Sequence, residues 1–152
     1  MPTSPPIPPP GTFRAKVVNA FTNANVTLYR RSGGRLGNTL KGAPVLLLDH
    51  VGRKSGRART APVLYMGDGE DLVIVASRGG SDAMPAWWLN LQANPATTVQ
   101  IGTERRHVLA REASPEERAV LWPRLVEMYG DFAIYQRRTD REIPVVILSP
   151  AG

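Results

Sequence analysis

The densest cluster of charge in this chain lies between Gly52 and Pro62, where the sequence reads GRKSGRARTAP. The cluster holds four basic residues and two glycines, and it contains no acid. Cationic side chains attract anions, and glycine lets the backbone N–H groups of a turn approach a phosphate closely. This basic loop therefore predicts a site for an anionic ligand. The pattern alone leaves three ligands open: nucleic acid, a membrane surface, and the anionic tail of a small molecule.

The excess positive charge of the chain lies elsewhere. The net charge is +6, and residues 1–48 contain six basic residues and no acid, whereas basic and acidic residues balance in the rest. A nucleic-acid-binding protein more often spreads its excess over the folded face and interleaves aromatic residues with it. We therefore expect no nucleic-acid partner. The distribution indicates a basic arm attached to a near-neutral domain.

The familiar patterns of self-sufficient catalysis are missing. Lys54 does not complete a Walker A loop, because Leu48 and Arg53 stand where glycines are required. Gly67–Asp71 lacks the third glycine of a dinucleotide fingerprint, and no Gly-x-Ser-x-Gly elbow is present. An enzyme with this sequence is therefore expected to use the chemistry of a cofactor.

We also expect no metal site, because His50 and His107 are isolated and the chain has no cysteine. The absence of cysteine agrees with a reducing cytoplasm. No apolar run approaches the roughly 18 residues of a membrane span, and no signal-peptide pattern opens the chain. The expected location is the cytoplasm, with peripheral contact at the inner face of the cell membrane as a second option.

Three parts are predicted along the chain. Residues 1–12 are rich in proline and indicate a disordered tail. Residues 13–41 form a basic arm whose apolar side chains recur at helical spacing: Phe13, Val17, Ala20, Phe21, Ala24 and Leu28. The arm could dock on the domain as an amphipathic helix, or it could serve as a membrane-surface anchor or a lid. Residues 42–152 form the folded domain.

The folded domain combines short strands with a few helices. Strands are expected at residues 44–52, 59–66, 72–77, 97–101, 106–112 and 143–150, and helices at residues 85–95, 114–130 and 131–139. Ser114 and Glu117 form a capping-box pattern, and Pro123 should kink or split the helix that they begin. Tight hairpins replace the alternation that a doubly wound sheet requires. The expected fold is mainly β, a small antiparallel barrel with helices packed outside it.

Three segments together resemble one known family: the basic loop, the run DGEDLVIVASRGG, and the helix PAWWLNLQANP, followed by the C-terminal stretch from ERAVLW to ILSP. In this order they are similar to the deazaflavin-dependent nitroreductases and quinone reductases of actinobacteria. The resemblance covers about Pro44 to Pro150. It implies a split antiparallel β-barrel related to flavin-binding split barrels. It also implies coenzyme F420 as the cofactor and quinones as acceptors, with nitroaromatic compounds as a second class.

The resemblance gives the basic loop a ligand. Coenzyme F420 carries a phosphodiester and a glutamate tail, and the resemblance assigns these to Arg53, Lys54, Ser55, Gly56 and Arg59. Thr60, Ala61 and Pro62 would then line the path of the ribityl chain. Exposed ion pairs contribute only roughly 0.2–1 kcal/mol each. We therefore expect the cations to orient the cofactor, while burial of its ring provides most of the affinity.

The ring is expected at the ASRGG segment (Ala76–Gly80) and the tryptophan helix. The resemblance implies ring contacts from Ala76, Ser77, Arg78, Gly79, Trp87 and Asn90. Glycine here allows the backbone to lie against a flat ring. One of the two adjacent tryptophans should be core and the other could flank the ring. Arg78 stands where many relatives carry lysine.

The expected reaction needs no covalent residue. A quinone or nitro acceptor gains negative charge on oxygen, so a nearby hydroxyl can stabilise or protonate it. The resemblance points to Ser77, Tyr129 and Tyr135 for this catalytic role. Phe132 falls where some nitroimidazole-reducing relatives carry tyrosine, which argues against activity on bulky nitroimidazoles and leaves quinone reduction in place.

Two alternatives remain at this point. Related split barrels bind FMN or haem, so an FMN-binding reductase would fit the same fold. A non-catalytic module, either a cofactor carrier or a nucleic-acid binder led by the basic arm, is the alternative from another class. An FMN-binding reductase would show no preference for a polyglutamate tail, whereas an F420-binding protein would. A nucleic-acid binder would show a steep salt dependence that maps to residues 1–41.

Overall fold

The computed structural model describes residues 25–151. Its strands are β1 (Thr39–Leu40), β2 (Ala43–Val51), β3 (Ala58–Leu64), β4 (Met66–Asp68), β5 (Asp71–Val75), β6 (Ala96–Ile101), β7 (Glu104–Glu112) and β8 (Val145–Pro150). Its helices are α2 (Ala86–Ala93), α3 (Pro115–Met128) and α4 (Asp131–Arg137), with a 3₁₀ turn η1 (Arg78–Gly80). Residues 25–32 are helical as well. The predicted elements are confirmed, and the short strands β1 and β4 add to them.

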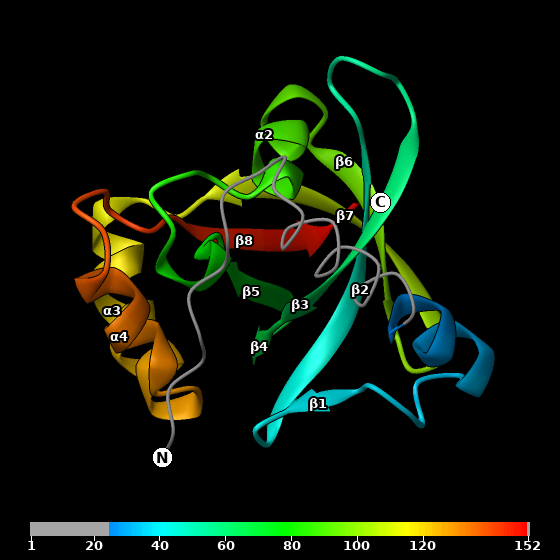
Figure 1. Cartoon of the computed structure of the whole chain (residues 1–152), viewed down its shortest axis with the longest axis horizontal. Helices are drawn as coiled ribbons and strands as arrows, with labels where there is room; N and C mark the ends of the chain where they lie inside the picture. The colour runs from blue at the N-terminus through cyan, green and yellow to red at the C-terminus, as the bar shows by residue number, and fades with distance from the viewer. Residues whose placement is uncertain (1–24, 152) are drawn as a thin grey trace, which may run out of the picture.

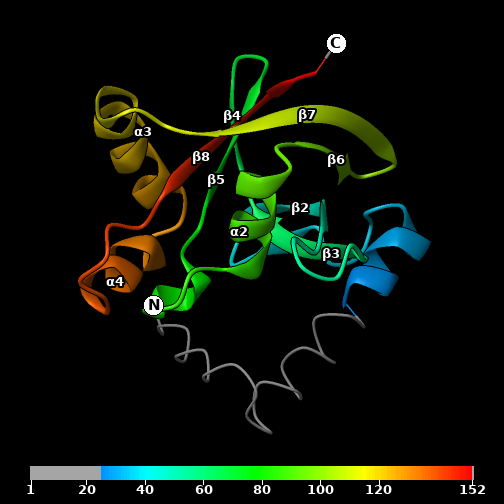
Figure 2. The ribbon, with the colours of Figure 1, turned by 90° about the horizontal axis from the view of Figure 1, so that it is seen from above.

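The strands form one curled antiparallel sheet in the order β1-β2-β6-β7-β8-β5-β4, with β3 paired to β2. The predicted hairpins are confirmed, since Asp68 pairs with Asp71 and Ile101 with Glu104. In Figures 1 and 2, α3 and α4 lie together at one end of the sheet, the helical segment 25–32 lies at the other end, and α2 lies between them. The expected split β-barrel with helices packed outside is thus the observed fold.

Strand β5 lies at the centre of the packing. Val73 and Val75 face a cluster formed with α3 and α4, while Leu72 and Ile74 face a second cluster formed with α2 and β2. Each of the four is at most 5% exposed. The alternation follows from the two-residue period of a strand. The prediction of a strand buried on both faces is confirmed, and each such side chain contributes about 1.5–3 kcal/mol on burial.

The N-terminus of α3 has the predicted capping box. Ser114 Oγ accepts from the Glu117 N–H at 3.2 Å, and a Glu117 carboxylate oxygen accepts from the Ser114 N–H at 3.0 Å. The Arg111 guanidinium also binds this carboxylate and, with the Ser114 N–H, lowers the pKa of Glu117 to about 2. The helix continues through Pro123 without the expected split.

The segment 25–32 is attached to the barrel through Tyr29. Its side chain is 1% exposed, and its hydroxyl donates to the Val45 carbonyl at 3.1 Å and accepts from the Gly102 N–H at 2.9 Å. Leu28, which belongs to the predicted apolar stripe, is 48% exposed. The rest of that stripe lies outside the described residues, as does the predicted tail at residues 1–12. The docking face of this segment is therefore centred on Tyr29 and not on Leu28.

Within residues 25–151, no helix is both long enough and apolar enough to cross a bilayer.

Candidate functional site

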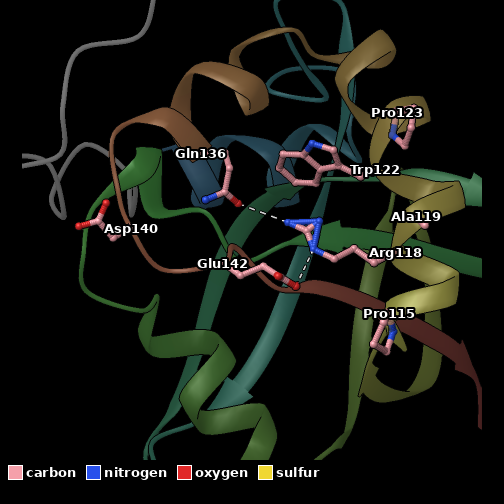
Figure 3. A pocket seen from close by; sticks show the side chains of 8 residues that line it. All are labelled: Pro115, Arg118, Ala119, Trp122, Pro123, Gln136, Asp140 and Glu142. Carbon is pink, nitrogen blue, oxygen red and sulfur yellow. Dashed lines mark hydrogen bonds and ion pairs between the residues drawn. The ribbon is translucent and has the colours of Figure 1, made fainter.

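One concavity lies between α3 and the segment that runs from α4 to β8, and it holds none of the predicted site residues. It measures about 630 Å³ and is wide open to solvent. Figure 3 shows that Arg118 in this concavity already has protein partners: its guanidinium pairs with Glu142 at 3.0 Å and donates to Gln136 at 3.3 Å, and it lies 4.5 Å from the Trp122 ring. The predicted residues gather elsewhere.

A second cavity, of about 300 Å³, lies between β3, η1, α2 and the C-terminal helices. We refer to it as the central cavity. Its lining residues are Leu40, Pro62, Val63, Leu64, Val75, Ser77, Arg78, Gly79, Trp87, Tyr129, Phe132 and Tyr135. The fold thus brings together all three predicted catalytic residues, of which Ser77 is also a predicted cofactor residue. Four further predicted cofactor residues line the same cavity: Pro62, Arg78, Gly79 and Trp87. Apolar walls with a few convergent polar groups are typical of small-molecule sites.

The two tryptophans of α2 divide as expected. Trp88 is 3% exposed and packs in the core cluster, while Trp87 lines the central cavity. Ala76, expected at the ring, is fully buried in the same core cluster and does not line the cavity.

Arg53, Lys54, Ser55 and Gly56 lie in the exposed connection between β2 and β3. The turn is tight, because the Gly56 N–H donates to the Gly52 carbonyl at 2.8 Å and Ser55 Oγ accepts from the Arg57 N–H at 3.2 Å. Gly56 has φ +69, and a Cβ there would meet no atom within 4 Å. Glycine is therefore needed for the backbone conformation, and the space beside it is open to a ligand.

Asn90 attaches this basic loop to α2. The side chain is 2% exposed, and its Oδ1 accepts from the Arg53 backbone N–H and from Arg53 Nη1, each at 3.1 Å. Its Nδ2 lies 2.9 Å from His50 Nδ1. Since the oxygen faces two donors, the amide nitrogen must donate to His50, whose Nδ1 is then unprotonated. A direct contact of Asn90 with a ligand remains a prediction.

His50 is a buried neighbour of the basic loop that sequence reasoning set aside as isolated. It is 7% exposed. Burial, followed by the positive charge of Arg59, lowers the pKa of His50 below its ordinary value of 6.5, against the opposing effect of Asp49. A neutral His50 is what the hydrogen bond from Asn90 requires. The signal in the sequence was weak, because the partners are 40 positions apart.

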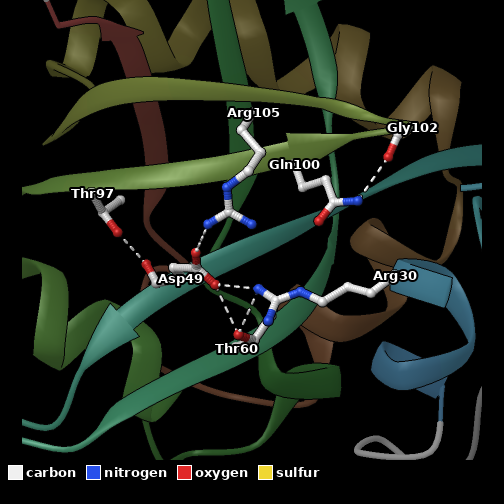
Figure 4. A network of polar contacts seen from close by, with 7 residues as sticks. All are labelled: Arg30, Asp49, Thr60, Thr97, Gln100, Gly102 and Arg105. Atoms are coloured by element: carbon white, nitrogen blue, oxygen red, sulfur yellow. Dashed lines mark hydrogen bonds and ion pairs between the residues drawn. The ribbon is translucent and has the colours of Figure 1, made fainter. Parts of the chain in front are cut away.

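Thr60, expected beside the ribityl chain, belongs to a polar network around Asp49 (Figure 4). Thr60 Oγ1 donates to Asp49 Oδ1 at 2.8 Å, and Arg30 binds both. Arg105 binds the other carboxylate oxygen at 2.8 Å, and Thr97 donates to the Asp49 carbonyl. The network links the segment 25–32 to strands β2, β3, β6 and β7. Thr60 therefore has a structural role here, whatever it contacts in addition.

The ASRGG segment leaves β5 and turns through three consecutive left-handed residues. Arg78, Gly79 and Gly80 have φ values of 45, 62 and 83. A Cβ at Gly80 would lie 2.6 Å from the Tyr135 carbonyl oxygen and 2.9 Å from its Cα. Glycine at position 80 is thus required by the close approach of α4. This contact connects the predicted ring segment directly to the tyrosine-bearing helix.

Arg141 holds the same segment from behind, and sequence reasoning missed it. Its guanidinium donates to the carbonyls of Ser77 at 2.9 Å, Ser81 at 2.9 Å and Ala76 at 3.2 Å. Burial is the main cause that lowers the pKa of Arg141 from its ordinary value. The guanidinium nevertheless stays charged, as it does in proteins generally. Its five donors in a fixed fork can bind several carbonyls of one turn at once. Arg138 adds a bond to the Gly79 carbonyl at 3.1 Å.

The aromatic wall of the central cavity comes from α4 and the end of α3. Tyr129 and Tyr135 are 3% and 6% exposed, and their hydroxyl oxygens lie 3.0 Å apart. The Phe132 ring packs edge-on against Tyr129 at a centroid distance of 4.9 Å. Two hydroxyls beside an apolar ring can donate hydrogen bonds to a bound acceptor.

In the part of the chain that the structure describes, no group of three His, Asp or Glu side chains gathers as a metal site would require.

The sequence profile of the F420H(2)-dependent quinone reductases matches residues 21–150. The F420H(2)-dependent quinone reductase of Mycobacterium tuberculosis (strain H37Rv) is 40% identical over 126 residues, which cover 80% of this chain and 85% of that protein. Another protein of the same strain, to which this activity is provisionally assigned, is 50% identical over 110 residues, or 72% of this chain and 92% of that protein. A solved F420H2-dependent reductase superposes with a TM-score of 0.64 at 39% identity, over 70% of this chain and 94% of that one. This chain belongs to the F420H(2)-dependent quinone reductase family.

Proposed function

We propose that this protein reduces quinones with reduced coenzyme F420, and that it accepts nitroaromatic compounds as a second class. One observation supports the proposal most directly: the basic loop and the central cavity lie at opposite ends of β3 in a member of this family. At roughly 3.3 Å per residue, the strand from Ala58 to Pro62 separates them by about 13 Å. An elongated ligand with an anionic tail and a flat ring can occupy both.

The residues present fit such a cofactor. Arg53, Lys54 and Arg59 provide cations for the tail, and the open turn at Gly56 provides backbone donors. Pro62 and Trp87 provide apolar contact for the ring. We propose Ala61 as part of the path between them. Bound reduced F420 supplies a hydride from its ring carbon.

The chain's own residues would orient the acceptor and manage its proton. Ser77, Tyr129 and Tyr135 face one cavity, so their hydroxyls can donate to an acceptor oxygen as charge develops on it. Phe132 and Trp87 make part of the cavity wall apolar, which keeps water from the reacting atoms. Arg78 adds a positive charge at the rim of the cavity. Phe132 favours a flat quinone over a bulky nitroimidazole as the acceptor, because phenylalanine lacks the hydroxyl that tyrosine would offer to a nitroimidazole at this position.

A first experiment tests the cofactor. Purified protein is titrated with F420, FMN and NADPH by fluorescence, at low and high salt. The proposal expects micromolar or tighter binding of F420 alone, weakened moderately by salt, followed by reduction of a soluble quinone. Preference for FMN would support the FMN-binding alternative and contradict the proposal.

For the arm at residues 13–41 we keep two proposals, closure over the acceptor and peripheral contact with a membrane. Most of the apolar stripe that motivates them lies outside the described residues. Deleting residues 1–24 spares Tyr29 and Arg30, which attach the segment to the barrel. Sedimentation with anionic liposomes and the KM for a long-chain quinone then test the two roles separately. If the deletion changes neither liposome binding nor this KM, both proposals are contradicted.

A further inference from the structure

A partly buried ion pair lies next to the central cavity. Lys41 Nζ is 2.7 Å from Asp131 Oδ2, and the side chains are 28% and 7% exposed. Lys41 belongs to the two-residue turn between β1 and β2, while Asp131 opens α4, 90 positions later. The pair has no part in the site as described above.

The pair continues a row of hydrogen-bonding groups that reaches the central cavity. The Tyr129 hydroxyl donates to the same Asp131 oxygen across a long 3.5 Å contact, and it lies 3.0 Å from the Tyr135 hydroxyl. Tyr129 lines both the central cavity and a neighbouring cavity of about 280 Å³, which Lys41 and Asp131 also line. The four groups thus extend from a partly exposed ammonium to the expected position of the acceptor. We refer to Lys41, Asp131, Tyr129 and Tyr135 as the relay.

The backbone at Lys41 is in a conformation that lysine seldom adopts. Lys41 has φ 49 and Gly42 has φ 82, as both central residues of a type I′ hairpin require. Such a turn favours asparagine or glycine at the first position, and a left-handed lysine is disfavoured by about 1 kcal/mol or more. A buried ion pair is itself weak support for stability, because desolvation offsets the attraction. The strained turn and the partly buried pair together favour a functional reason for placing this ammonium here.

We propose that Lys41 and Asp131 return protons to the two tyrosines during quinone reduction, an inference that rests on the proposed function. One hydride carries two electrons and one proton to the quinone and leaves a hydroquinone monoanion. The monoanion takes a proton from the tyrosine hydroxyl that faces it, so one O–H bond breaks as another forms. A proton lost by Tyr135 is replaced from the Tyr129 hydroxyl, and Tyr129 recovers its proton from Asp131 Oδ2, which takes it from the Lys41 ammonium. Lys41 Nζ then takes a proton from the solvent, which supplies the second proton of the hydroquinone. Lys41 and Asp131 act through the tyrosines and are positioning residues.

The test compares Asp131→Asn, Lys41→Met and Lys41→Arg with the wild type in steady-state quinone reduction. The first two should lower kcat about tenfold or more, with a larger solvent isotope effect in D₂O because proton return becomes limiting. Lys41→Arg keeps the charge and should retain at least a third of kcat. Arg124→Met breaks an exposed ion pair between α3 and Asp68 of β4, at a residue that lines neither of the two cavities beside the relay, and should change neither quantity. Thermal melting shows whether each variant folds. If Asp131→Asn does not fold, the comparison of Lys41→Met with Lys41→Arg tests the proposal.

Two readouts do not depend on turnover. The Kd for F420, from fluorescence, should stay within twofold in all variants. In ligand-free protein labelled with ¹³C-tyrosine, Asp131→Asn and Lys41→Met should shift the Cζ resonance of Tyr129, assigned with Tyr129→Phe, and leave that of Tyr65 in place. Unchanged kcat and isotope effect in Asp131→Asn would overturn the proposal, as would a weaker Kd with unchanged kcat. If the wild type neither binds F420 nor reduces a quinone, the proposed function fails, and the NMR result still reports whether the row of hydrogen bonds exists.

Discussion

The basic loop and the ASRGG segment are the two proposed binding regions of this protein, and they are held in place differently. Residues 53–56 of the basic loop are exposed, and their conformation rests on a local turn and on the amide of Asn90. The ASRGG segment is fixed by residues about 60 positions away, Arg138 and Arg141, and by contact with the backbone of α4. A tail site tolerates movement, whereas the position of a reacting ring must be fixed closely. The difference predicts large effects on turnover at the second region and modest effects on affinity at the first.

Replacement of Arg141 should have the largest effect. Arg141→Met removes the charged donor of three carbonyls, those of Ala76, Ser77 and Ser81. Of these, the Ser77 carbonyl keeps a backbone bond, from the Gly80 N–H. Charged hydrogen bonds contribute about 1.5–3 kcal/mol each, so we expect destabilisation of at least about 2 kcal/mol and a loss of kcat of a hundredfold or more. Denaturant unfolding and quinone turnover measure the two. Arg141→Lys should recover little, because an ammonium cannot reproduce the fork. Wild-type turnover in Arg141→Met would contradict the view that turnover depends on how closely the ASRGG segment is fixed.

Gly80→Ala should have the second-largest effect. The new methyl group would lie 2.6 Å from the Tyr135 carbonyl oxygen, and φ is +83, so either the turn or α4 must move. We expect a loss of about 2 kcal/mol in the free energy of unfolding and a fall in kcat that exceeds the change in the Kd for F420. Gly67→Ala is the matched control, since a Cβ there meets no atom within 4 Å. Equal effects of the two substitutions would contradict the role assigned to the contact with α4.

The two regions also differ in how far the sequence predicted them. The basic loop is contiguous, so its residues and its turn could be recognised from spacing alone. The strands, hairpins and capping box were equally local, and they are confirmed. Arg141, His50 and the pairing of Lys41 with Asp131 depend on which segments the sheet brings together, and no local pattern reports that. Ala76 and Thr60 were assigned to the ligand by position in a motif; the structure shows that Ala76 also packs in the core and that Thr60 also belongs to the Asp49 network, and their ligand contacts stay predictions.

Asn90→Ala tests the attachment of residues 53–56 to α2. It leaves the buried His50 Nδ1 and the Arg53 N–H without their partner. The Kd for F420 should rise about tenfold, equivalent to about 1.4 kcal/mol, while kcat at saturating cofactor stays within threefold. Fluorescence titration and saturation kinetics separate the two. A fall in kcat with an unchanged Kd would mean that Asn90 belongs functionally with the ring.

The pH dependence of stability should reveal His50. Because burial and Arg59 lower the pKa of His50 in the folded protein, the unfolded chain binds more protons just below the ordinary value of 6.5. The stabilising contribution of neutral His50 is complete above pH 6.5 and is lost as the pH falls toward the lowered pKa. The free energy of unfolding should decrease there by at most about 1.4 kcal/mol per pH unit. His50→Gln should remove this part of the slope between pH 7.5 and 5, and identical slopes would contradict the assignment.

The smallest effect is expected at Lys54. Its side chain is exposed, and exposed ion pairs contribute roughly 0.2–1 kcal/mol, so Lys54→Met should raise the Kd for F420 by about two- to fivefold at low salt. Screening should reduce the difference nearly to zero at 1 M salt, where the Debye length is about 3 Å. Arg124→Met, which removes an equal charge far along α3, is the control. A larger loss at Lys54 that persists at high salt would mean that the bound cofactor buries this ammonium, so that the tail end of the site is as closely fitted as the ring end.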